Sequence, residues 1–168
     1  MENNSVIVRN ERKISSMALF WLCLLATVGA GLTVAYCSGI LGGINHLAGI
    51  PLAIPRWVVI ATPPVLFVHL GLALFFALDQ NVYTQNGKAV RACLWVFWVM
   101  LFIATAILPY FIVNNMAIAA YIVATIATAF ALGTTVLAYN HTIAGGVVMT
   151  IFLAAIVLIM VYLGYWAF

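Results

Sequence analysis

The sequence contains few charged side chains: 168 residues include only six Lys or Arg and three Asp or Glu. From Ala92 to Phe168 there is no charged residue at all. A soluble domain uses about 25% charged residues, whereas this chain has 5% and is 67% hydrophobic, with a mean hydropathy of +1.23. The composition excludes a soluble enzyme domain, a disordered chain and, because the cations are scattered, a nucleic-acid-binding protein. We expect the surface of the protein to be in contact with a lipid bilayer.

Groups that carry out catalysis are also missing. There is no GxSxG motif, no Ser-His-acid order and no pair of carboxylates for acid–base chemistry. The three cysteines form no CxxC pair, and each lies inside an apolar run, at Cys23, Cys37 and Cys93. The histidines lie in the first loop, the second apolar run and the last connector, at His46, His69 and His141. The sequence therefore predicts no catalytic residues, no metal site and no enzyme.

Five apolar runs are each long enough to cross a bilayer, which takes about 20 helical residues. They cover residues 17–40, 57–78, 89–113, 116–139 and 143–168, with a long first loop at 41–56. Asn114-Asn115 and Asn140-His141-Thr142 are tight breaks between runs. The runs are continuously apolar rather than alternating, which indicates helices and not barrel strands. The predicted fold is an all-α integral membrane protein, a single five-transmembrane-helix bundle over residues 1–168.

The basic residues predict the orientation of this bundle. With the N-terminus in the cytoplasm, only Arg56 lies outside, and the cytoplasmic side holds Arg9, Arg12, Lys13, Lys88 and Arg91. Cytoplasmic loops of membrane proteins carry the excess of Lys and Arg. We therefore expect a multi-pass protein with a cytoplasmic N-terminus and an external C-terminus.

Small residues mark the surfaces where helices can approach closely in lipid. The first run has Ala26, Gly29, Ala30 and Gly31, the fourth has Ala120, Ala124, Ala127, Ala131 and Thr135, and the fifth begins with Gly145-Gly146. Two interpretations fit this pattern: packing within one chain, or the contact surface of a homodimer.

His69 lies in the middle of the second run, and an ionisable residue at that depth is by default a functional candidate. The alternative is a structural imidazole bonded to a backbone carbonyl or a hydroxyl. No carboxylate lies at helical spacing from it, so it has no partner for a proton relay.

The first loop carries an unusual proline pattern. Pro51 and Pro55 precede Trp57, and Pro63-Pro64 follow within the second run, where they should start or kink the helix. One interpretation is an ordinary connector, and the other is a semi-rigid lid over an apolar pocket.

At this loop the chain resembles the TspO/MBR family, the tryptophan-rich sensory and translocator proteins. The residues that match its loop and second helix are Pro51, Pro55, Trp57, Leu66, Phe67 (where the family has Tyr), Gly71 and Ala73. Length and layout also agree over most of the chain. Ile50 and Pro63 stand where the family has Lys and Trp, so the chain resembles a divergent member.

The resemblance implies a binding protein, since similar proteins hold porphyrins, sterol-like lipids or drug-like aromatics inside the bundle and are often dimers. Trp57 and Phe67 would then contact the ligand, and Pro51 and Pro55 would shape the lid. His69 would be a polar anchor, or an axial contact to a tetrapyrrole metal. A porphyrin-modifying activity stays open, but no resident cofactor is expected. The alternative function is a structural or accessory subunit of a membrane complex, with no small-ligand site.

Overall fold

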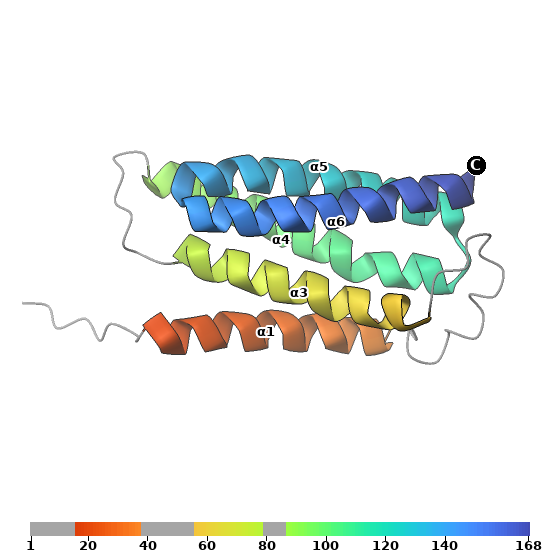
Figure 1. Ribbon diagram of the computed structural model, residues 1–168, viewed down its shortest axis with the longest axis horizontal. Helices are drawn as coiled ribbons and strands as arrows, with labels where there is room; N and C mark the ends of the chain where they lie inside the picture. Colours follow the sequence, from red (N-terminus) through yellow and green to blue (C-terminus); the bar gives the residue numbers. More distant parts are fainter. Residues whose placement is uncertain (1–15, 38–55, 79–86) are drawn as a thin grey trace, which may run out of the picture.

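The structure, a computed structural model, describes residues 16–37, 56–78 and 87–168. They form α1 (Ser16–Cys37), α3 (Arg56–Leu78), α4 (Gly87–Val113), α5 (Ala117–His141) and α6 (Ile143–Ala167). The five helices lie side by side in one elongated bundle (Figure 1), and each is long and apolar enough to cross a membrane. The predicted fold class is confirmed: the chain is a multi-pass, five-helix membrane bundle.

The helices pack in the cyclic order α1, α3, α6, α5, α4. The contacts of α5 with α6 and with α4 are the most extensive, whereas α1 packs chiefly against α3 and only lightly against α4. The start of α1 and the end of α6 lie at opposite ends of the bundle (Figure 1). The first helix is therefore the peripheral member of the ring.

Two short turns join the last three helices, at the breaks that the sequence predicts. After α4, Asn115 has a φ of 57°, and the Met116 N–H donates to the Phe111 carbonyl (2.9 Å) while the Asn115 N–H donates to the Ile112 carbonyl (3.2 Å). This pair of bonds is the Schellman motif, and Asn tolerates the left-handed conformation that the motif requires. Before α6, the Thr142 hydroxyl accepts from the Gly145 N–H (3.0 Å) and caps the helix.

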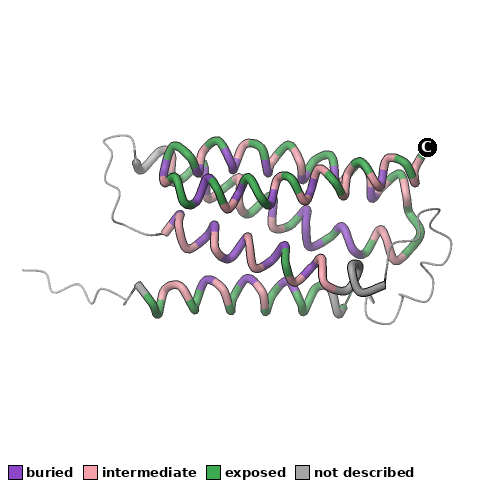
Figure 2. The backbone as a smooth tube through the Cα atoms, viewed as in Figure 1, coloured by how far each residue is buried: buried purple, intermediate pink, exposed green. Residues whose placement is uncertain are grey.

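The small residues of α5 face the interior of the bundle. The buried positions, coloured purple in Figure 2, include Ala120, Ala124, Ala127, Ala131 and Thr135. The Thr135 hydroxyl also lies 3.2 Å from the Met149 carbonyl of α6, so the two helices are in direct contact. This surface is packed within the chain and is not available to a second copy.

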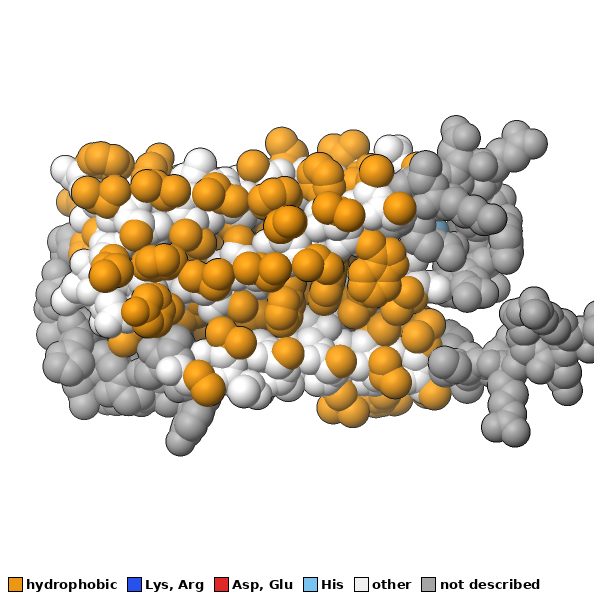
Figure 3. Space-filling model, turned by 180° about the vertical axis from the view of Figure 1, so that it is seen from behind, with side chains coloured by type: hydrophobic (Ala, Val, Ile, Leu, Met, Phe, Trp, Pro, Cys, Tyr) orange, Lys and Arg blue, Asp and Glu red, His pale blue; other side chains and the backbone are white. Residues whose placement is uncertain are grey.

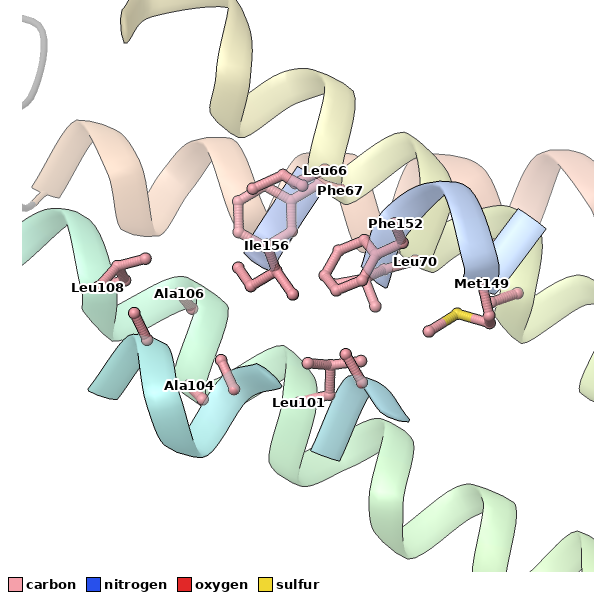
Figure 4. Packing of buried hydrophobic residues seen from close by; sticks show 14 of the residues in the cluster. Leu66, Phe67, Leu70, Leu101, Ala104, Ala106, Leu108, Met149, Phe152 and Ile156 are labelled. Atoms are coloured by element: carbon pink, nitrogen blue, oxygen red, sulfur yellow. The ribbon is translucent and has the colours of Figure 1, made fainter. Parts of the chain in front are cut away.

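Apolar side chains also fill the centre of the bundle. Phe67 and Leu70 of α3 meet Leu101 of α4 and Phe152 and Met149 of α6 in one buried cluster (Figure 4). Many outward-facing side chains are apolar as well (Figure 3). No side chain that the structure describes is charged, which fits a surface in contact with lipid.

Of the two roles expected for Pro63-Pro64, starting a helix is wrong. α3 begins at Arg56 and contains both prolines. Pro has no N–H, so the carbonyls of Val59 and Ile60 lack their usual helical donors. The missing bonds fall near the start of α3.

Candidate functional site

The lid residues of the predicted site lie outside the part of the chain that the structure describes. This holds for Pro51 and Pro55. Trp57 is in the first turn of α3, but its side chain is also outside the described part. The lid and its tryptophan therefore stay predictions.

Phe67 lies where three helices meet. Its side chain is 1% exposed and its ring packs against Phe102 of α4 at 5.6 Å between centroids. On the other side the ring lies over Gly31 of α1, where any added Cβ would overlap it. Phe67 thus joins α1, α3 and α4, and its ring is covered by protein.

Partly exposed aromatic rings continue from Phe67 along α4. The ring of Trp98 stacks on Phe102 at 5.4 Å with 16° between the planes, and Trp95 meets Trp98 edge-on at 6.1 Å. We call Phe67, Phe102, Trp98 and Trp95 the aromatic row. It gives the bundle a set of flat apolar surfaces beside α1 and α4, two neighbouring helices that pack only lightly against each other.

A hydrogen bond fixes the orientation of Trp98. Its indole N–H donates to the Leu70 carbonyl of α3 at 3.0 Å, which orients the ring and ties α4 to α3. A buried indole N–H normally finds such a partner. The sequence signal for the row is the spacing of Trp95, Trp98 and Phe102, which puts all three on one side of a helix. From the sequence alone, however, the two tryptophans fit an interfacial aromatic belt equally well.

His69 is partly exposed on α3. Its Nδ1 lies 2.8 Å from the Val65 carbonyl one turn earlier, the backbone bond that the structural interpretation predicts. His69 follows Phe67 by two positions, which separates the two side chains by about 200° around the helix. The structure therefore does not bring Phe67 and His69 together on one face.

Other chemistry-bearing groups do not cluster. Among the described residues there is no group of three His, Cys, Asp or Glu that could hold a metal ion. The cysteines are unbridged: Cys23 is buried, and Cys37 and Cys93 are exposed at positions near opposite ends of different helices. The aromatic row and His69 are the two features of this region that a ligand could use.

Comparison of the chain with protein-family models, with curated proteins and with solved structures finds no match. The resemblance to the TspO/MBR family therefore depends on residues 51–73 and on the five-span layout.

Proposed function

We propose that the chain is a membrane receptor or carrier, similar to the TspO/MBR proteins, that binds a flat apolar ligand within the bundle. The observation that carries this proposal is the aromatic row, in which Trp98 and Phe102 present nearly parallel, partly exposed rings. Aromatic surfaces with few polar groups suit a ligand of fused rings, such as a porphyrin, a sterol-like lipid or a drug-like aromatic.

The proposed ligand lies against α4 on the side of α1. Phe67 lies beneath this region, packed between Gly31 and Phe102, and supports the exposed rings from inside the bundle. α1 is the helix with the least contact to the rest of the ring, so it is the helix whose displacement admits a ligand at lowest cost.

The test is thermal unfolding of the detergent-solubilised protein with protoporphyrin, a sterol and an isoquinoline-type aromatic. A ligand that binds only the folded state raises the melting temperature. We expect at least one class to do so, and Trp98→Leu to weaken its binding about tenfold or more. The matched control is Trp21→Leu, because Trp21 is 52% exposed and its ring packs edge-on against Phe20 of its own helix. A melting temperature unmoved by the whole panel would overturn the proposal.

The alternative, an accessory subunit, is favoured by a different surface. On α1 the small residues Ala26, Gly29, Ala30 and Thr33 are exposed, and nothing lies within 4 Å of a Cβ placed on Gly29. Small residues at this spacing let a second helix approach closely in lipid. A single stoichiometric partner that copurifies with the wild type and is lost with Gly29→Leu would support this function.

A further inference from the structure

The hydrogen bond of His69 determines which of its ring nitrogens is a donor. Nδ1 lies 2.8 Å from the Val65 carbonyl oxygen, and a carbonyl oxygen only accepts, so Nδ1 carries the hydrogen. In the neutral imidazole the other nitrogen, Nε2, then has a bare lone pair and is an acceptor. Among the described residues, Nε2 has no hydrogen-bond partner.

The described side chains on this side of α3 are uncharged and, apart from Thr62, apolar. Leu66, Ala73 and Phe76 lie on the same side of α3 as His69, three, four and seven positions away. Phe76 packs against Gly145 of α6, so His69 lies toward the boundary between α3 and α6. Val65, one turn before His69, is 51% exposed, which leaves this boundary open to the bilayer.

We propose that Nε2 of His69 accepts a hydrogen bond from the hydroxyl of a neutral, bilayer-dissolved molecule, an apolar alcohol or phenol. The depth of His69 within the span restricts its ligands to molecules dissolved in the bilayer, and the lack of charged neighbours among the described side chains selects a neutral one. Because Nδ1 carries the hydrogen, Nε2 can only accept a hydrogen bond. It can therefore bond to a hydroxyl, but not to a ketone, quinone or ether, whose oxygens are acceptors too. This site is separate from the proposed ligand region, since Phe67 faces the other side of α3.

The test compares two probes that differ only at the donor, 4-phenylphenol and its methyl ether. Both are titrated into the full chain in lipid nanodiscs, with wild type and His69→Leu side by side. We expect wild type to bind the phenol about tenfold more tightly than the ether, which is the effect of one net hydrogen bond, and His69→Leu to bind both alike. Leu72→Ala is the matched control, because Leu72 is a partly exposed neighbour on the same helix that has no acceptor.

A second measurement keeps the proposal falsifiable if His69→Leu does not fold. With ¹⁵N-labelled histidine, the Nε2 resonance of His69 should shift on adding the phenol and stay unchanged with the ether. Equal affinities of wild type for the two probes, or a preference that survives in His69→Leu, would overturn the proposal. So would self-association through His69, seen as dimers of the wild type that His69→Leu does not form. The Trp98→Leu variant tests the ligand at the aromatic row and leaves the His69 site intact. Either proposal can therefore fail while the other stands.

Discussion

At the scale of single residues, Gly31 decides how closely α1 can approach Phe67. The ring of Phe67 occupies the space that a Cβ at Gly31 would take. Gly29, on the same helix, has open space around it and is exposed. The two glycines therefore have different roles: one permits a helix contact, and the other faces away from the bundle.

This difference gives a prediction for Gly31→Ala. The added methyl group must push Phe67 or α1 aside, so the free energy of unfolding should fall by about 1–3 kcal/mol, the usual effect of overpacking. Gly29→Ala should change it by no more than about 1 kcal/mol, with helix propensity favouring Ala. Equilibrium unfolding of both variants in detergent gives the comparison.

Phe67→Leu supplies the control, because a smaller side chain relieves the overlap. The pair Gly31→Ala with Phe67→Leu should then lose less stability than the two single changes added together. Equal stabilities of Gly31→Ala and Gly29→Ala would show that Phe67 does not lie against α1 in this way.

Residue positions were predicted from sequence to very different degrees. The backbone bond of His69 follows from helical geometry, since the carbonyl four residues earlier is the nearest acceptor for a histidine inside an apolar span. The burial of Phe67 could not be predicted, because a membrane helix is apolar on all sides and lipid is as apolar as the core. Because α3 has no polar face, its hydrophobic pattern does not show which side of the helix faces the bundle. It therefore could not show that Phe67 faces the interior and His69 does not.

At the scale of elements, the breaks and the small-residue spacing carried the strongest signals. Asn114-Asn115 predicts a turn because Asn adopts the left-handed conformation at low cost, and Asn115 does so. The alanine spacing of α5 predicts a close helix contact, and the residues are buried within the chain. The aromatic row was missed, since tryptophans in a span fit an interfacial belt equally well.

The alanine surface of α5 can be tested with two substitutions on the same helix. Ala127 is fully buried and Ala129 is exposed. Ala127→Leu must separate α5 from its neighbours, and we expect it to lower the free energy of unfolding by about 1–3 kcal/mol or to prevent folding. Ala129→Leu faces lipid and should stay within about 0.5 kcal/mol of wild type. Comparable losses for the two variants, measured by unfolding in SDS titrations, would contradict the observed orientation of α5.

At the scale of the whole molecule, the number of spans was predictable and their order in the ring was not. Each run is long enough to cross the bilayer by itself, so counting runs needs no knowledge of contacts. The cyclic order α1, α3, α6, α5, α4 depends on which small residues meet which rings, such as Gly31 with Phe67 and Gly133 with Phe97. The contacts that close the ring, α3 with α6 and α1 with α4, join helices that do not follow one another in the sequence. Spacing along one helix does not identify such a partner.

The last prediction concerns the orientation of the bundle in its membrane. The first residues of α1 and of α4 lie at one end of the bundle, and the first residue of α3 lies at the other (Figure 1). The first end therefore adjoins the segments that carry Arg9, Arg12, Lys13, Lys88 and Arg91, while Arg56 belongs to the second. This bias predicts that the first end faces the cytoplasm. In intact cells, protease should then remove a C-terminal tag and leave an N-terminal tag until the membrane is opened.

Cys37 provides an internal check, because it is the exposed last residue of α1 and belongs to the second end of the bundle. An impermeant maleimide should label it in intact cells, and Cys37→Ser should abolish that label. Cys23 is buried within the same helix and should not react. Cleavage of the N-terminal tag in intact cells, with a protected C-terminal tag, would invert the orientation. Cleavage of both tags there would contradict five crossings, because an odd number of spans puts the two ends of the chain on opposite faces.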